Sequence, residues 1–404
     1  MKIVIADYIY TPQGYRIGEA VAFDDRIRGI GVADALTAQF PDAEIIRTPA
    51  HSVLYPGLIN THVHLEFSSN KTTLEYGDFI PWLHSVIEHR SVLTELCDDA
   101  TMTEACQQML RSGITGFGAI SSFGLELEVC KRAPQRVTFF NELIGSDAKT
   151  ADMLYGDFLE RVSHSEAADK EDKITPAIAI HAPYSVHPVV LQRAISLAKQ
   201  KHYPLSAHFL ESPAEKEWLA SHSGGFAAFF EKFFGSSKAV TSAEEFLHQF
   251  NSYPTHFIHC VQTSKAQKQY LAAQRHSIAH CPRSNRLLGC GRLAIEDIEG
   301  TMSIATDGLS SNWSLSLWDE MRAALMLHHQ GPLLQMADRF IRSVTSDAAQ
   351  AIRSDAGRLE AGAPADITVI TLPSRPEQTE ALSLYAILHT QHATQLYIDG
   401  KKIL

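Results

Sequence analysis

The chain has 404 residues, 45% of them hydrophobic and 9% aromatic, which suits a large folded barrel with a small appended domain and argues against disorder. Its 35 basic and 46 acidic residues give a net charge of -11, which argues against general binding to nucleic-acid backbones. No apolar run is long enough to span a membrane, and the N-terminus lacks the pattern of a signal peptide. The six cysteines form no CxxC pair, so we expect reduced thiols in a cytoplasmic protein. From the charge and the apolar runs we expect neither a membrane nor a nucleic-acid partner.

Both ends of the chain have the pattern of short strands separated by turns. Residues 1–55 contain KIVIADYIYT, GEAVAFDD and RIRGIGVA, and the far end contains ADITVITL and ATQLYIDGKKIL. In the last of these, Asp399-Gly400 is a hairpin signal. We therefore expect residues 1–55 and 361–404 to form one composite small β-sandwich domain.

Between residues 56 and 360, short apolar runs alternate with longer segments of helical period, which is typical of parallel strands joined by crossover helices. The runs number eight, as a TIM-type barrel requires. They are Leu58–Leu65, Thr115–Ile120, Arg136–Leu143, Ala177–His181, Leu205–Leu210, His256–Cys260, Ser277–His280 and Ser303–Thr306. The sequence predicts an α/β protein with a catalytic (β/α)8 barrel over residues 56–360.

Most of the predicted strands end on an ionisable side chain. The C-terminal strand ends of such a barrel surround its active site, so we expect these groups to converge. They are His62, His64, Glu142, His181, His208, His259, His280 and Asp307.

Four of these side chains make a coherent metal-ligand set. His62 and His64 are two residues apart on one strand, so both rings point to the same side. His208 adds a third nitrogen and Asp307 a carboxylate, while a catalytic site keeps one position open for water. We expect one divalent metal per subunit, with zinc as the first expectation and iron(II) or manganese as alternatives. A bridged two-metal site would need a lysine where this chain has His181.

Two further residues are predicted to take part in the reaction, one by transferring protons and one by stabilising negative charge. Glu211 lies three residues after His208, where its carboxylate would reach a water molecule beside the metal and act as general acid and base. The alternative is a surface glutamate that starts a helix at Pro213. His259 would stabilise the developing negative charge, or else be a buried histidine satisfied by the backbone. Nothing assigns a role to His280.

The segment GGFAAFFEKFFG, residues 224–235, places its phenylalanines at helical spacing. We interpret it as a helix that packs its aromatic face on the barrel or on a partner subunit, with a lid over an aromatic substrate pocket as the alternative. A homodimer is left open.

The motifs of the middle segment resemble those of the amidohydrolase superfamily, in its mononuclear adenine-type deaminase branch. The matching stretches are PGLINTHVHLEF at 56–67, HAPYSVHP at 181–188, SAHFLES at 206–212 and TDGLSSNWSLSLWDEMR at 306–322. Within that branch the chain looks most like the aminodeoxyfutalosine deaminases, through HLEFSSNKTTLEYGDFIPWLHSVI at 64–87, FGAISS at 117–122 and CPRSNRLL at 281–288.

The resemblance implies deamination of a purine nucleoside, 6-amino-6-deoxyfutalosine, in menaquinone biosynthesis. It assigns His62, His64, His208 and Asp307 to the metal, Glu211, His259 and Asp307 to catalysis, and His181 to the nucleoside sugar. Glu66 and Glu142 are expected to bind ribose or purine polar groups, with a structural role as the alternative. Arg283, Arg286 and Lys71 are the candidates for the substrate carboxylate.

Two other functions stay open at the level of the sequence. One is a deaminase of methylthioadenosine, S-adenosylhomocysteine or adenosine, or another amidohydrolase that acts on guanine or a triazine. The other is a barrel without metal that serves as a binding scaffold. The complete ligand set and Glu211 count against the scaffold.

Overall fold

The computed structural model describes residues 1–168, 173–251 and 253–404. Its centre is an eight-stranded parallel sheet in which each strand pairs with the next one along the chain. The strands are β8 (Leu58–Val63), β9 (Ile114–Ser121), β10 (Arg136–Leu143), β11 (Ile174–Ile180), β12 (Leu205–Phe209), β13 (His256–His259), β14 (Ser277–His280) and β15 (Met302–Ile304). Each coincides with one of the predicted runs, apart from shifts at the ends, and the (β/α)8 barrel is confirmed.

The barrel closes between its first and last strands. The backbone N–H of Asp307 donates to the His62 carbonyl at 3.1 Å, and the Thr306 N–H donates to Asn60 Oδ1 at the same distance. Thr61 and Ser303 join their hydroxyls at 2.8 Å. These bonds bring the residues that follow β15 against the end of β8, which is where the predicted metal ligands lie.

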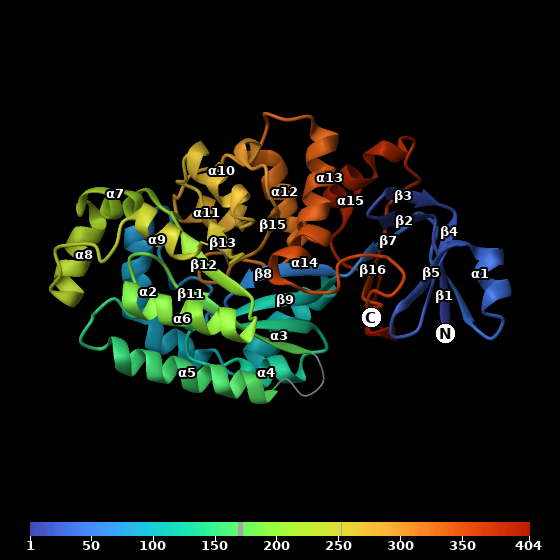
Figure 1. Ribbon diagram of the computed structural model, residues 1–404. Coiled ribbons are helices and arrows are strands. Elements are labelled where there is room, and N and C mark those ends of the chain that lie inside the picture. The colour runs from blue at the N-terminus through green and yellow to red at the C-terminus, as the bar shows by residue number, and fades with distance from the viewer. Residues whose placement is uncertain (169–172, 252) are drawn as a thin grey trace.

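Helices cover the outside of the barrel (Figure 1). They are α2 (Phe79–Leu96), α3 (Asp99–Arg111), α4 (Leu127–Arg132), α5 (Ala151–Ala168), α6 (Pro188–Lys201), α7 (Pro213–Ser221), α8 (Gly225–Phe234), α9 (Ala243–Gln249), α10 (Lys265–Ala273), α11 (Pro282–Leu287), α12 (Leu317–Leu327), α13 (Leu333–Ser343), α14 (Ser346–Ile352) and α15 (Leu382–His389).

Local sequence signals set several of these helix starts. Ser242 and Glu245 form a capping box at the start of α9, and Ser264 and Gln267 form another at the start of α10. Ser212 caps α7, whose first residue is a proline. Because α7 starts directly after Glu211, this cap also fixes where the backbone of Glu211 lies.

Two small sheets pack face to face to form the sandwich. One has the order β5 (Ile27–Val32), β4 (Glu19–Phe23), β1 (Lys2–Ile5), β6 (Glu44–Arg47), with α1 (Ala33–Gln39) against it. The other has the order β18 (Lys401–Lys402), β17 (Gln395–Ile398), β16 (Ile367–Thr371), β7 (Ser52–Pro56), β2 (Tyr8–Thr11), β3 (Gly14–Ile17). Their shared core includes Val4, Phe23, Leu54, Ile367 and Tyr397. The predicted sandwich from both chain ends is confirmed.

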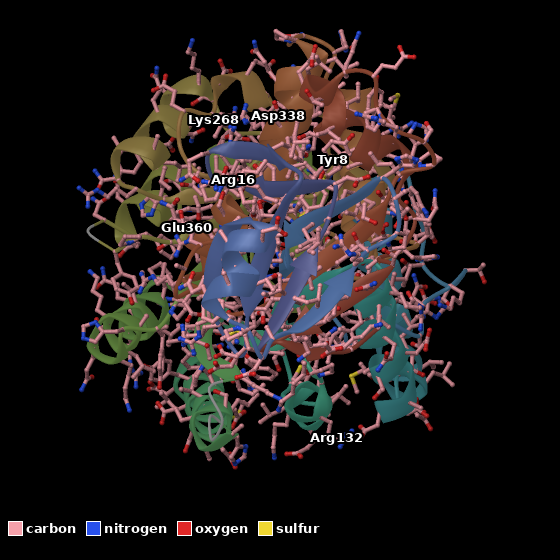
Figure 2. All side chains as sticks on the ribbon, turned by 90° about the vertical axis from the view of Figure 1, so that its right-hand side faces the viewer. Tyr8, Arg16, Arg132, Lys268, Asp338 and Glu360 are labelled. Carbon is pink, nitrogen blue, oxygen red and sulfur yellow. The ribbon has the colours of Figure 1, made fainter. Side chains whose placement is uncertain are left out.

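The chain passes from sandwich to barrel across Gly57, between β7 and β8. A Cβ at Gly57 would lie 1.9 Å from Thr115 Oγ1, so this crossing has no room for a side chain. Figure 2 views the molecule from the sandwich side and shows the small sheets in front of the barrel. In the part of the chain that the structure describes, no helix has the length and apolarity to cross a membrane, and the six cysteines are unbridged and buried.

Candidate metal centre and active site

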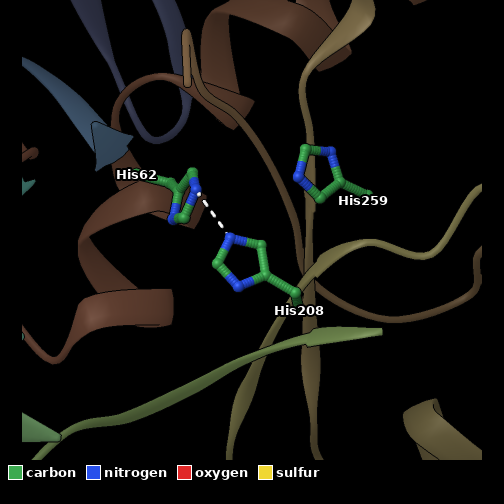
Figure 3. Close-up of side chains that lie close together, drawn as sticks. All are labelled: His62, His208 and His259. Atoms are coloured by element: carbon green, nitrogen blue, oxygen red, sulfur yellow. Dashed lines mark hydrogen bonds between the residues drawn. The ribbon is translucent and has the colours of Figure 1, made fainter. Parts of the chain in front are cut away.

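Three imidazoles and one carboxylate meet at the C-terminal mouth of the barrel. The Nε2 atoms of His62 and His208 lie 3.2 Å apart, and Asp307 Oδ1 lies 3.6 Å from His62 Nε2 and 3.8 Å from His64 Nε2. The predicted ligand set is therefore brought together. Figure 3 shows a ring nitrogen of His62 pointing at a ring nitrogen of His208, with the ring of His259 beside them.

The backbone at these strand ends takes unusual conformations that aim the side chains inward. Leu210, His259 and Asp307 all have positive φ, at 46°, 67° and 60°. Gly308 follows at a close approach, because a Cβ there would lie 2.8 Å from the Cβ of His64. Strain of this kind is concentrated at functional sites and is maintained by the surrounding packing.

The protonation states suit a divalent cation. Burial lowers the pKa of His62 to about 4 and holds the pKa of His208 well below its usual value, so both rings are neutral donors. Burial opposes the charge of Asp307, but His62 and His64 outweigh it and hold the carboxyl pKa well below its usual value. Burial also disfavours a charged His64, yet Glu66 and Asp307 raise its pKa to about 9. The site thus favours a positive charge, which a metal ion would supply in competition with that proton.

Asp307 is held by neighbouring hydroxyl groups. Ser284 Oγ and Ser311 Oγ each donate to Oδ2 at 2.8 Å, and the Gly308 N–H donates to Oδ1 at 2.7 Å. Oδ2 is therefore occupied, and Oδ1 is the oxygen that faces the histidines. The sequence prediction did not include these two serines, since serine is common at turns and caps.

Glu211 lies directly after the His208 strand, as predicted, and is 7% exposed. Its Oε1 is 3.5 Å from His259 Nε2. Burial and the nearby carboxylates of Asp307 and Glu215 raise its pKa well above the usual value. The ring of His259 is oriented by Asn285, whose Oδ1 lies 2.9 Å from His259 Nδ1. The opposite ring nitrogen, Nε2, therefore faces Glu211.

Glu215 is a second buried carboxylate that the sequence prediction missed. It accepts the N–H of Leu210 at 3.0 Å and the N–H of Glu211 at 2.8 Å. These bonds fix the turn that carries Glu211. Its position four residues after Glu211, in the first turn of α7, was the signal that could have revealed it.

A pair of glutamates lies beside the histidines. The hydroxyl of Ser122 is 2.9 Å from Glu66 Oε1 and 2.7 Å from Glu142 Oε2, so it bridges them. The other oxygen of Glu142 is buried without a hydrogen-bond partner among the described residues, and it lies 3.9 Å from His208 Nδ1. Burial raises the pKa of Glu142 to about 7.

These groups line one cavity of about 530 Å³. His64, His181, His208, Glu211, His259 and Asp307 contribute to its lining, as do Glu66, Glu142 and Ser122. His181 is oriented by Ser185 Oγ, 2.5 Å from its Nδ1. Apolar side chains make up much of the remaining wall, as is usual for small-molecule sites.

Helix α8 combines the two alternatives considered for the Phe-rich segment. Phe226 is fully buried and packs on Tyr184 with ring centroids 4.6 Å apart. Phe229, Phe230 and Phe234 from the same helix line the cavity. The helix is packed on the barrel and also forms a wall of the site.

The structure does not bring Arg283, Arg286 or Lys71 into the cavity lining. Arg283 is 3% exposed because its Nε donates to Glu320 Oε1 at 2.6 Å, and its guanidinium stacks 4.6 Å from the ring centre of Trp313. Arg286 is exposed on α11, and Lys71 lies in a separate shallow pocket.

The arginines that do line the cavity are Arg90 and Arg161, which the sequence prediction missed. Both lie on long helices, α2 and α5, where an arginine is ordinarily a solvated residue. No sequence pattern marked them. His280, to which no role was assigned, is fully buried, with its Nε2 2.9 Å from His328 Nε2.

Comparison with known proteins gives concordant matches. The sequence pattern of the amidohydrolase family matches residues 53–403. An aminodeoxyfutalosine deaminase of Nitratiruptor sp. is 42% identical over 403 residues, which cover 100% of this chain and 99% of that protein. An adenosine deaminase of Helicobacter pylori is 34% identical, covering 95% and 94%. The crystal structure of Helicobacter pylori aminofutalosine deaminase in complex with methylthio-coformycin superimposes with a TM-score of 0.95, 32% identity and full coverage of both chains.

Proposed function

This chain belongs to the amidohydrolase family, and we propose that within it the protein is a hydrolytic deaminase of 6-amino-6-deoxyfutalosine. The reaction replaces the C6 amino group of the adenine ring by oxygen and gives futalosine and ammonia. The observation that carries this function is the placement of Glu211 beside His259 and the His/Asp cluster, on the floor of a cavity of nucleoside size. The product would enter the futalosine route to menaquinone, in the cytoplasm.

The amidohydrolase family is typically metal-dependent, and the residues present fit such a group. His62, His64, His208 and Asp307 would hold one divalent cation, since His62 and His208 are neutral donors, Asp307 is an ionised carboxylate, and His64 would exchange its proton for the cation. A cation bound there lowers the pKa of water and so supplies a nucleophile at neutral pH. Zinc fits this donor set best, while iron(II) and manganese accept the same ligands.

Glu211 moves the proton. It accepts a proton from the attacking water and delivers it to N1 of the adenine ring, which allows oxygen to add at C6. A carboxyl with a raised pKa suits this work, because it retains the proton long enough to deliver it. Glu215 holds the backbone of Glu211 and thereby limits the positions that the carboxylate can adopt.

His259 and Asp307 act on the tetrahedral carbon. We assign the Nε2 edge of His259 to the new C6 oxygen, whose negative charge it would stabilise, and the carboxylate of Asp307 to the transfer of that oxygen's proton to the departing amino group. The atoms balance, since water supplies the carbonyl oxygen, one hydrogen that stays on N1 of the product and one hydrogen that converts the amino group into ammonia.

Substrate contacts follow from the cavity lining. His181 would contact the nucleoside sugar. Glu66 and Glu142 would accept hydrogen bonds from the ribose hydroxyls, because the free oxygen of Glu142 is buried without a partner among the described residues. A ribose hydroxyl that donates to this oxygen would give the buried acceptor a hydrogen bond and so offset its desolvation penalty.

The test is ammonia release from the purified protein with aminodeoxyfutalosine, methylthioadenosine, adenosine, adenine and guanine. We expect the highest kcat/KM with aminodeoxyfutalosine. Methylthioadenosine or adenosine as the best substrate would favour the second candidate, a deaminase of smaller nucleosides, which the similarity to the Helicobacter pylori adenosine deaminase supports. Turnover of guanine or a triazine alone would exclude both candidates. A folded protein without stoichiometric metal would instead support the scaffold.

A further inference from the structure

Two guanidinium groups line the cavity and form no ion pair with the carboxylates of the described residues. Arg161 on α5 donates from Nη2 to the backbone carbonyl of Glu142 at 2.8 Å. Its Nε is buried and has no hydrogen-bond partner among the described residues. Arg90 on α2 lies with its Cζ 4.1 Å from the ring centre of Phe123. Within the described ranges, neither guanidinium has a carboxylate oxygen within 4.0 Å.

This lack of pairing contrasts with two other arginines of the barrel. Arg283 is paired with Glu320, and Arg136 is paired with Asp366 at 2.9 Å. The chain carries 46 acidic residues against 35 basic ones, so partners are plentiful. Two guanidiniums that line one cavity and have no ion-pair partner among the described residues therefore offer donors to an anionic ligand, and the planar guanidinium matches a carboxylate in geometry.

The polar groups of the cavity follow a definite order. The histidines come first, and both glutamates lie next to them, since Glu142 is 3.9 Å from His208 Nδ1 and Glu66 is 3.9 Å from His64 Nδ1. Ser122 then joins Glu142 to Glu66. The guanidiniums lie beside this pair, because Arg161 donates to the backbone carbonyl of Glu142 and Arg90 stacks on Phe123, the residue after Ser122.

The proposed substrate presents its groups in the same order. The adenine C6 belongs at the metal cluster, the ribose hydroxyls follow, and the 5′ arm ends in an aryl carboxylate. The apolar wall of the same cavity includes Leu83, Ile87, Ile144 and Phe234, which suit an aromatic ring.

We propose that Arg90 and Arg161 form the subsite for the carboxylate on the 5′ arm, and that they make the enzyme select an anionic aryl nucleoside over a neutral one. This inference rests on the proposed function, because it assigns the far end of that substrate. Arg161 is partly buried and supplies the inner donors of the subsite. Arg90 is exposed and supplies the outer donors, and its guanidinium is held by stacking on the ring of Phe123.

The test compares two substrates that share the purine and the ribose. The variants Arg161→Gln and Arg90→Gln are assayed with aminodeoxyfutalosine and with 5′-methylthioadenosine, which has a neutral 5′ substituent. For the anionic substrate we expect kcat/KM to fall about 10- to 100-fold, the size of a lost charge-assisted hydrogen bond. For methylthioadenosine we expect a change below about threefold. Arg193→Gln is the matched control, since Arg193 also stacks on an aromatic ring, 4.0 Å from the centre of Tyr155, but lies outside the cavity lining.

Equal losses on both substrates would overturn the proposal, because they would indicate a structural role, and so would unchanged kinetics in both variants. Arg161→Lys keeps the charge and should restore part of the selectivity, which a packing role would not predict. Binding of 3-acetylbenzoate, measured by calorimetry, tests the subsite without catalysis. If the native protein binds this probe and the Arg161→Gln variant does not, the subsite stands even where no nucleoside is deaminated. If both bind it equally, the subsite is wrong whatever the deaminase activity.

Discussion

At the scale of single residues, two carboxyl groups in one cavity have opposite pKa shifts. Asp307 faces His62 and His64, which keep it ionised despite its burial. Glu211 is buried near two other carboxylates, Asp307 and Glu215, which favour its protonated form. Paired groups whose environments separate their pKa values take different roles, and here one is suited to hold a cation and the other to hold a proton.

We predict that Glu211→Gln lowers kcat by about 10²- to 10⁴-fold, because the amide cannot accept a proton from water. The metal content, measured by elemental analysis, should be unchanged, since Glu211 is not among the four metal donors. Glu217→Gln is the control, because Glu217 is an exposed residue of the neighbouring helix α7. Activity near the native level in Glu211→Gln would remove this residue from the mechanism.

We predict that Ser284→Ala weakens metal binding about 10- to 100-fold, the usual effect of losing a hydrogen bond that orients a ligand. The change frees Oδ2 of Asp307 from one of its two hydroxyl donors. Competition with a chelator measures the dissociation constant directly. Ser112→Ala removes a buried hydroxyl that donates to the Met109 carbonyl at 2.8 Å, away from the metal donors, and should leave metal affinity unaltered. An unchanged affinity in Ser284→Ala would show that Ser311 holds Asp307 alone.

At the scale of elements, the barrel strands place the donors and the segments after them set the orientation. Helix α8 is an example, because one face packs on α2 through Phe226 and Phe79, with ring centroids 6.0 Å apart, while Phe234 lines the cavity. At the opposite ends of the strands, the loop before β14 buries His276, whose Nδ1 accepts the N–H of Thr255, the residue before β13.

We predict that Phe226→Ala lowers the free energy of unfolding by about 3–5 kcal/mol, since Phe226 is 0% exposed and its removal leaves a cavity. Phe233→Ala, in the same helix but 39% exposed, should cost much less. Urea denaturation compares the two variants. Equal losses would indicate that α8 is not anchored by its buried face.

His276 predicts a dependence of stability on pH. Burial lowers its pKa from 6.5 to about 4, and its Nδ1 accepts the N–H of Thr255 at 3.1 Å. Between these pH values the unfolded chain binds a proton that the folded chain does not, so stability falls as the pH falls from 6.5 to 4. The loss from this residue is about 3 kcal/mol.

His276→Asn should remove that part of the acid sensitivity, because the Asn oxygen can accept the same N–H and does not titrate. Unfolding free energies at pH 7 and pH 4.5 give the slope for each protein. His392→Asn, at an exposed position, should keep the native slope. A native slope in His276→Asn would assign the acid sensitivity to other groups.

At the scale of the whole molecule, an ion-pair cluster joins barrel and sandwich. Arg136, the first residue of β10, binds Asp366 at 2.9 Å and also pairs with Asp399, between β17 and β18. Asp366 is 1% exposed, and it also accepts the N–H of Asp399 at 2.9 Å. The cluster connects the two parts of the chain beside the crossing at Gly57.

We predict that Arg136→Met costs about 3–5 kcal/mol of stability, because it leaves the buried carboxylate of Asp366 without its cation. Arg132→Met removes an exposed pair with Asp99 and should give no measurable change. Thermal and urea unfolding of both variants are the measurements. A small loss in Arg136→Met would mean that Asp366 takes up a proton instead.

The sequence by itself determined the barrel, the sandwich and the convergence of the strand-end donors. Period-two and helical patterns are local, and in a parallel barrel the end of a strand fixes the position of its side chain along the axis. His62, His64, His208, Asp307 and Glu211 could therefore be placed together from the chain alone.

Only the tertiary structure decided which side chains surround those donors. The predicted anion partners, Arg283 and Arg286, lie outside the cavity lining, because α11 turns Arg283 toward the buried Glu320. Arg90 and Arg161 line it instead, since their positions depend on how α2 and α5 pack around the barrel mouth. Packing between distant segments sets the rotation of each helix about its axis, and a helical pattern alone does not show which polar residue will face the site.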